Sequence, residues 1–205
     1  MFFSEATYPT HGLKDTLSHV FGRLSGDNSC RAIHRLETAF GGGKTHTLIA
    51  CTHLAHRGND LAPLVSALLD PTLLSQPGEV TVVGISGDSL PVQKPHGAHL
   101  RPYTLWGEIA YQVGGESLYQ QMGAEANSYA APGEDFFNEV FQGRKVLIML
   151  DELAQYAARL EAAHQGGGDQ LAAFQMSLHS YARTHLGIVV ILTLASSTDA
   201  FTKQT

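Results

Sequence analysis

The chain has 205 residues, 43% of them hydrophobic and 16% charged, and its formal net charge at pH 7 is −6. This length suffices for one α/β domain with its own core, and the composition excludes a disordered chain. The negative charge excludes a global basic field that would attract nucleic acid, and no basic cluster stands out in the sequence.

The cysteine count and the hydropathy pattern favour a reduced, cytoplasmic setting. Two cysteines, Cys30 and Cys51, are too few for a disulfide framework, and Cys51 is expected to be a small buried thiol in an apolar helix. The N-terminus lacks the layout of a signal peptide, and no apolar run approaches the ~18 residues that span a bilayer. We therefore expect no membrane partner.

The eleven histidines raise the question of a metal site. His53 with His56, and His96 with His99, are spaced i,i+3, but neither pair has a third ligand nearby in a zinc pattern. Surface or helix histidines are the favoured interpretation.

The chain begins with alternating helical and strand patterns. Residues 1–30 are expected to form an N-terminal helical entry segment, with a helix at about 13–24 whose apolar residues lie on one stripe. A strand at 31–37 and a helix at 44–56 follow, and Gly58 is expected to stop that helix.

The next elements are less regular. Residues 61–74 predict a second helical stretch, interrupted or bounded by Pro63 and Pro71. The β-branched, nearly all-apolar run at 80–85 favours a parallel strand that is buried on both faces.

A long loop occupies the middle of the chain at 87–102, and loops of this length are usually functional or mobile. A helix at 103–113 carries Trp106, for which an anchoring role in the core is favoured over base stacking. Residues 114–132 are weakly patterned, and 135–141 predict a short helix.

The last third of the chain contains two unbroken apolar strands. The first, at 146–150, leads into a helix at 153–164, in which Arg159 and Glu161 are expected to be solvated. The remaining elements are a glycine-rich turn, a helix and a strand, at 166–168, 169–185 and 188–194. Strands alternating with helices predict a parallel sheet with helices on both faces.

A glycine-rich run joins the first strand to its helix and has the pattern of a phosphate-binding loop. The nucleotide-binding candidates are consecutive: Phe40, Gly41, Gly42, Gly43, Lys44, Thr45 and His46. Without Cβ atoms, successive N–H groups can converge on one anion at the start of a helix. Lys44 can reach the β- and γ-phosphates of a nucleotide, and Thr45 can place its hydroxyl on Mg²⁺. Thr38 stands where the usual G-x-x-x-x-G-K-[ST] spacing has its first glycine, and a plain connector is the alternative interpretation.

An acidic pair follows the apolar strand at 146–150. Because the carboxyl ends of parallel strands meet at one edge, Asp151 can hold Mg²⁺ beside Thr45, directly or through water. Glu152 can orient or deprotonate an attacking water. The alternative is an acidic strand end without catalytic meaning.

Polar residues at two other strand ends are weaker candidates. Ser196, or as second choice Thr193, could sense a γ-phosphate, although ordinary turn chemistry is slightly favoured. Ser86 or Asp88 could hydrogen-bond Glu152 and set its orientation.

No arginine finger can be identified in the sequence. Arg144 and Arg183 are available, but a surface position is the favoured interpretation for each.

Three strings carry a resemblance to a known family: Arg35-Leu36-Glu37-Thr38-x-Phe40-Gly41-Gly42-Gly43-Lys44-Thr45-His46, Tyr103-Thr104-Leu105-Trp106-Gly107-Glu108-Ile109-Ala110 and Leu150-Asp151-Glu152-Leu153. With Thr7-Tyr8-Pro9-Thr10-x-Gly12-Leu13, they make nearly the whole chain similar to the prokaryotic ATPases of domain-of-unknown-function family 499. Thr38 belongs to that family's pattern.

The resemblance implies an AAA+-like P-loop NTPase with three αβα layers around a mostly parallel sheet, of the class with an additional strand and a catalytic Glu. Its cofactors would be ATP and Mg²⁺. Family members resemble components of anti-phage defence clusters, next to DNA methyltransferases and helicases. They are longer than this chain, which implies that residues 31–205 are an ATPase core truncated at its C-terminal end.

The leading hypothesis is therefore Mg²⁺-dependent ATP hydrolysis by the motor or switch part of a larger prokaryotic defence protein. In this view Glu152, Lys44 and Ser196 are catalytic, and Thr45 and Asp151 hold the metal. Protein partners are expected, with homo-oligomers possible where an arginine acts in trans, and nucleic acid is contacted only indirectly. The alternative is a nucleotide-gated interaction module with little or no hydrolysis. A small-molecule kinase and a GTPase are weaker alternatives.

Overall fold

The computed structural model describes residues 10–38, 43–96 and 101–195. Four parallel strands form one sheet in the order β1-β4-β3-β2. Their bounds are Ile33–Thr38 for β1, Val80–Ser86 for β2, Lys145–Asp151 for β3 and Ile188–Ala195 for β4. The predicted parallel sheet is confirmed, and each strand lies within two residues of its expected position.

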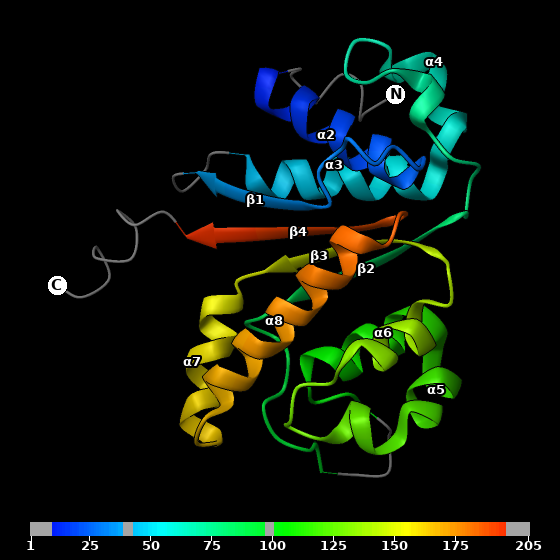
Figure 1. Cartoon of the computed structure of the whole chain (residues 1–205). Coiled ribbons are helices and arrows are strands. Elements are labelled where there is room, and N and C mark those ends of the chain that lie inside the picture. The colour runs from blue at the N-terminus through cyan, green and yellow to red at the C-terminus, as the bar shows by residue number, and fades with distance from the viewer. Residues whose placement is uncertain (1–9, 39–42, 97–100, 196–205) are drawn as a thin grey trace, which may run out of the picture.

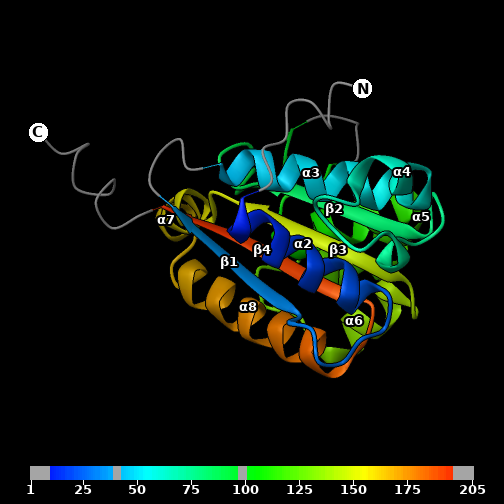
Figure 2. The same ribbon diagram turned by 90° about the horizontal axis from the view of Figure 1, so that it is seen from above.

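Helices cover both faces of the sheet, so the fold has three α/β/α layers (Figures 1 and 2). One face is covered by α2 (His11–Leu24), α3 (Lys44–Arg57) and the segment around α4 (Ala62–Val65). The other is covered by α5 (Leu105–Asn127), α6 (Glu134–Phe141), α7 (Leu153–Ala163) and α8 (Gly167–Thr184).

Burial on both faces explains the apolar sequence of a central strand, as β3 shows. Along β3, Val146, Ile148 and Leu150 pack into the core beneath α5 to α8, whereas Leu147 and Met149 pack into the core beneath α2 and α3. Both faces of a central parallel strand are therefore buried, and an unbroken apolar run is what such a strand requires.

The two edge strands are more polar than the central ones. On β1, Arg35 and Glu37 are exposed, in agreement with its moderately apolar sequence. Strand β2 was expected to be buried on both faces, and this is wrong in part, because β2 forms the opposite edge and Gly84 is exposed. The Gln112 side chain covers this edge: its Oε1 accepts from the Gly84 N–H at 2.8 Å, and its Nε2 donates to the Gly84 carbonyl at 3.0 Å.

Helix boundaries follow local signals where those signals are strong. The Thr10 hydroxyl accepts from the Leu13 N–H at the start of α2, and Gly58 ends α3 with φ of 48°. Cys51 is fully buried in α3, and burial raises the pKa of its thiol to about 12.

Two helical predictions need correction. The expected helix at 61–74 is broken into α4 and the 3₁₀ turns Gly58–Leu61 and Pro71–Leu73. Helix α5 extends far beyond the predicted 103–113, although Gly115 and Gly123 interrupt its helical geometry. Trp106 is fully buried and its Nε1 donates to the Ser128 carbonyl at 3.0 Å, which confirms its anchoring role.

In the part of the chain that the structure describes, no helix combines the length and apolarity needed to cross a membrane.

Candidate functional site

All four strands run in the same direction, so their carboxyl ends share one edge of the sheet (Figure 1). Thr38 ends β1, Asp151 ends β3 and Ser86 ends β2 beside Asp151. The structure therefore places two features on the same edge, as the sequence predicts. They are the end of β1, which precedes the glycine-rich run, and the acidic pair.

The described part of the glycine-rich run begins at Gly43, directly before α3. Gly43 has φ of 83° and ψ of 9°, the left-handed region that glycine adopts without strain, and its carbonyl accepts the Thr47 N–H at 2.9 Å. Lys44 and His46 are half-buried and Thr45 is exposed in the first helical turn. Phe40, Gly41 and Gly42 lie outside the described residues.

Helix α3 brings its first turn towards the acidic strand end. The Thr52 hydroxyl lies 3.9 Å from the Met149 sulfur, so α3 crosses β3 at this point. Since α3 connects two parallel strands, it runs against their direction. Thr45 lies about 10 Å from Thr52 along the helix, and Asp151 lies about 7 Å beyond Met149 along the strand, both towards the carboxyl edge.

Asp151 is held by the neighbouring strand. It is half-buried, and one of its carboxylate oxygens accepts a hydrogen bond from the hydroxyl of Thr193 on β4. Thr193 is itself 6% exposed and pairs in register with Leu36 of β1, which places Asp151, Thr193 and Leu36 in one row across the three strands. A carboxylate fixed on one oxygen keeps the other available for a cation.

Glu152 begins the turn into α7 with an unusual backbone. Its φ of 53° and ψ of 33° are left-handed, a conformation that in the described ranges only one other non-glycine residue, Gln142, shares at positive φ. Such a conformation costs about 1 kcal/mol or more for a residue with a Cβ. The Glu152 side chain is exposed, and its Oε2 accepts from Gln155 Nε2 at 3.0 Å.

The expected hydrogen bond from Ser86 or Asp88 to Glu152 is not formed. The Ser86 hydroxyl donates instead to the Asp88 carboxylate at 2.6 Å, because the two residues lie in the same tight turn. Gly87 between them is the residue that contacts the acidic pair, and its N–H donates to the Asp151 carbonyl at 2.8 Å.

Two side chains of α7 that were expected to be solvated have specific partners. One guanidinium nitrogen of Arg159 donates to the carbonyls of Gly87 and Leu90. Glu161 accepts the N–H groups of Gly166 and Gly168 at 3.1 and 2.9 Å, which lowers the pKa of its carboxyl group. Glu161 is exposed, as expected, whereas Arg159 is half-buried. The sequence pattern missed the contacts of both, because their partners are backbone groups.

The remaining candidates from the sequence are one serine and two arginines. Ser196 lies outside the described residues. Arg144 and Arg183 are exposed, as expected, and they directly precede β3 and the turn into β4, at the amino edge of the sheet. In the described ranges there is no cluster of three or more His, Cys, Asp or Glu side chains that could hold a metal.

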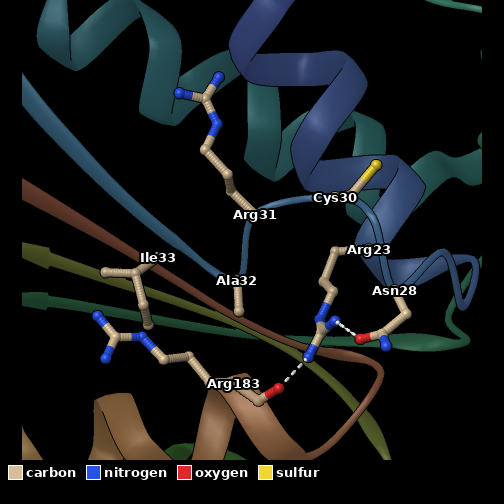
Figure 3. Close-up of a pocket in the computed structure, with 7 residues that line it drawn as sticks. All are labelled: Arg23, Asn28, Cys30, Arg31, Ala32, Ile33 and Arg183. Atoms are coloured by element: carbon tan, nitrogen blue, oxygen red, sulfur yellow. Dashed lines mark hydrogen bonds between the residues drawn. The ribbon is translucent and has the colours of Figure 1, made fainter.

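A cavity of about 340 Å³ lies at the amino edge, lined by side chains from α2, the start of β1 and the end of α8 (Figure 3). Three arginines line it, but their guanidinium groups point in different directions (Figure 3). Arg23 bonds the Asn28 side chain and carbonyls at the end of α8, and Arg31 pairs with Asp15. The charges do not converge on one point, so we assign this cavity to the joint between α2 and α8.

Comparison with known proteins identifies a family that matches nearly the whole chain. The family model described as the DUF499 N-terminal domain matches residues 1–203. No curated protein and no solved structure matched the chain.

Proposed function

The chain belongs to the family of the DUF499 N-terminal domain, and from this premise and the geometry of the strand ends we propose that it binds and hydrolyses ATP with Mg²⁺. In this proposal the protein is an AAA+-like P-loop ATPase, the motor or switch part of a larger defence protein. The observation that supports the proposal is that the first turn of α3, which begins at Lys44, and the end of β3 at Asp151 lie towards the same edge of the sheet.

The strand order supports the class of ATPase. Strand β4 lies between β1, which leads into the glycine-rich run, and β3, which ends in the acidic pair. The resemblance implies a class with an additional strand and a catalytic Glu, and a strand inserted between the two site-bearing strands agrees with it. The insertion also gives Asp151 its partner, Thr193.

The phosphate end of the nucleotide would lie against the first turn of α3. Gly43 adopts the left-handed conformation there, and the N–H groups at the start of an α-helix lack helical acceptors and carry partial positive charge. Lys44 would add a full positive charge for the β- and γ-phosphates. Phe40, Gly41, Gly42 and His46 would complete the cradle.

The proposed metal ligands fit Mg²⁺ in number and kind. A magnesium ion prefers oxygen ligands and keeps several waters, so it needs one or two protein groups beside the phosphates. Thr45 offers an exposed hydroxyl, and Asp151 offers the carboxylate oxygen that Thr193 leaves free. When bound, Mg²⁺ would neutralise charge on the β- and γ-phosphates.

Glu152 is the proposed general base. Its exposed carboxylate follows Asp151 directly, so it would lie next to the metal-bound phosphates, where it can accept a proton from an attacking water. Lys44 would stabilise the phosphoryl oxygens, and Ser196 would lie near the γ-phosphate if β4 continues along its course.

An arginine from outside the described site is a further part of the proposal. The two arginines considered from the sequence, Arg144 and Arg183, both lie at the amino edge, opposite the proposed nucleotide. A cation for the transition state would then come from another subunit or another segment, which favours a homo-oligomer or a protein partner in a cytoplasmic defence complex.

The test is ATP turnover by the full-length protein and by Glu152→Gln, with Glu125→Gln as a control for an exposed glutamate on α5. Glu152→Gln should keep nucleotide affinity and lose turnover about a hundredfold or more, while the control keeps both. Wild-type turnover that Glu152→Gln leaves unchanged would refute the role of Glu152.

The alternative function is a nucleotide-gated interaction module. Arg144 and Arg183 lie at the amino edge, so the protein without its partner would lack a cation for the transition state. Such a site binds ATP and hydrolyses it slowly, which favours this alternative. Tight binding of a labelled ATP analogue without phosphate release, in the presence and absence of partner proteins, would select this alternative.

A further inference from the structure

We propose that Arg159 is a positioning residue for Glu152 and acts on it through Gly87. The inference rests on the proposed function, in which Glu152 activates water. It concerns a side chain two helical turns away from the acidic pair that touches neither the nucleotide nor the metal.

Gly87 packs closely against the backbone of Glu152. A Cβ placed on Gly87 would lie 2.5 Å from the Glu152 carbonyl oxygen, 2.9 Å from its carbonyl carbon and 3.0 Å from Tyr156 Cβ. The Gly87 N–H donates to the Asp151 carbonyl at 2.8 Å. The position of Gly87 therefore restrains the two peptide units that flank Glu152.

Arg159 fixes Gly87 in turn. Its Nη2 donates to the Gly87 carbonyl and, at 2.8 Å, to the Leu90 carbonyl, and the side chain is half-buried. Arg159 belongs to α7, the helix that Glu152 begins. The loop at Gly87, the turn at Asp151 and Glu152, and helix α7 thus form one closed ring of contacts.

The backbone of Glu152 explains why such a ring is needed. A glutamate with φ of 53° relaxes towards negative φ unless its surroundings hold it, and relaxation would change the position of the carboxylate. Misplacement of a catalytic group by about 1 Å can lower a rate a hundredfold. The ring is therefore a requirement of the proposed chemistry.

The loop after β2 has a second anchor, so loss of Arg159 should not release it completely. The Val92 carbonyl accepts from the Tyr129 hydroxyl at 2.9 Å and from His164 Nε2 at 2.7 Å. An Arg159 variant should consequently keep its fold and lose only the restraint at Gly87.

The first experiment compares Arg159→Gln with Arg144→Gln in the full-length protein. Arg144 is the matched control, since its guanidinium also donates to a backbone carbonyl, that of Val140 at 3.2 Å, but at the other edge of the sheet. Arg159→Gln should lower kcat for ATP about tenfold to a hundredfold with an unchanged Kd for an ATP analogue, and Arg144→Gln should leave both unchanged.

A double mutant separates positioning from a general loss of structure. If Arg159 acts through Glu152, Arg159→Gln should cause no further loss of turnover in the Glu152→Gln background. Losses that multiply, or a Kd that rises with the fall in kcat, would overturn the inference.

A second variant tests the contact without removing a charge. Gly87→Ala should reproduce the loss of turnover, whereas Gly133→Ala, at a site where the added Cβ meets nothing within 4 Å, should not. Hydrogen exchange provides a readout other than activity: the Gly87 amide should exchange faster in Arg159→Gln and at the wild-type rate in Arg144→Gln.

The outcomes distinguish the two proposals. Wild-type turnover that depends on Glu152 but not on Arg159 or Gly87 overturns the inference and leaves the proposed function intact. A wild-type protein without turnover overturns both, whatever the exchange data show.

Discussion

The hydroxyl of Thr193 donates a hydrogen bond to the carboxylate of Asp151 across two neighbouring strands. Thr193 is buried, and Asp151 is the last residue of β3. The bond fixes one oxygen of the carboxylate and orients the other, so the position of the proposed metal ligand depends on a strand that comes last in the described chain.

Thr193→Val should therefore weaken the binding of Mg²⁺ that supports ATP turnover. Loss of a hydrogen bond to a charged group should raise the Mg²⁺ concentration at half-maximal turnover about tenfold, equivalent to ~1.4 kcal/mol. A magnesium titration measures this, and Thr193→Ser, which keeps the hydroxyl, is the control. Equal magnesium dependence in the two variants would show that the hydroxyl does not orient a ligand.

Lys44→Ala should reduce nucleotide affinity, which Glu152→Gln is expected to keep. A charge-assisted contact to phosphate is lost, and the Kd for an ATP analogue should rise about tenfold or more. Fluorescence titration checks it, with Lys14→Ala on α2 as the control for a lysine away from the site. An unaltered Kd in Lys44→Ala would remove the lysine from the proposed cradle.

Arg23 is expected to be important for stability and not for activity. It is 2% exposed and its guanidinium donates to Asn28 and to the carbonyls of Ala182, Arg183 and His185. Arg23→Met would remove the donor from the buried Ala182 carbonyl and the two part-buried ones, and should lower the free energy of unfolding by about 2–4 kcal/mol. Urea denaturation measures the loss.

The exposed neighbour provides the control for Arg23. Arg183→Gln should change the free energy of unfolding by less than about 0.5 kcal/mol. If both arginine variants were equally stable, the joint between α2 and α8 would not depend on the Arg23 guanidinium.

His34 makes stability depend on pH. Burial lowers the pKa of His34 from 6.5 to about 4, and its Nε2 donates to the Arg31 carbonyl at 3.0 Å. Because the folded pKa is the lower one, the unfolded chain takes up the proton first as pH falls. Stability from this group is complete above pH 6.5 and declines as pH falls towards 4, by up to about 3 kcal/mol.

His34→Gln should flatten the stability profile between pH 6.5 and 4. Denaturation at a series of pH values checks the prediction, and the variant His56→Gln, at an exposed position of α3, should retain the wild-type slope. A wild-type slope in His34→Gln would assign the pH dependence to other groups.

Local signals in the sequence predicted most of the fold. The unbroken apolar runs predicted β3 and β4 because a central parallel strand buries both faces, and Gly58 marked the end of its helix. Helix α5 was predicted too short because Gly115 and Gly123 dilute its pattern, while its burial depends on tertiary packing. The exposed edge of β2 was missed, since the order of strands leaves no trace in local periodicity.

The candidate site was predictable in part, because its residues adjoin strands with strong local signals. Gly43, Lys44, Thr45, Asp151 and Glu152 are adjacent to strands that the sequence identifies, and parallel strands end at one edge. The contacts that hold them were not predictable: Thr193 meets Asp151 through strand order, and Arg159 reaches Gly87 through a backbone carbonyl. Neither leaves a local pattern.

The central claim is that one magnesium–ATP unit joins the first turn of α3 to the end of β3. The most direct measurement is a crystal structure of the full-length protein with a non-hydrolysable ATP analogue and Mn²⁺, whose anomalous signal locates the metal. We predict a metal about 2.1 Å from the Thr45 hydroxyl oxygen and bound to the Asp151 carboxylate directly or through one water. A nucleotide at another place, or a metal that Asp151 does not reach, would contradict the claim.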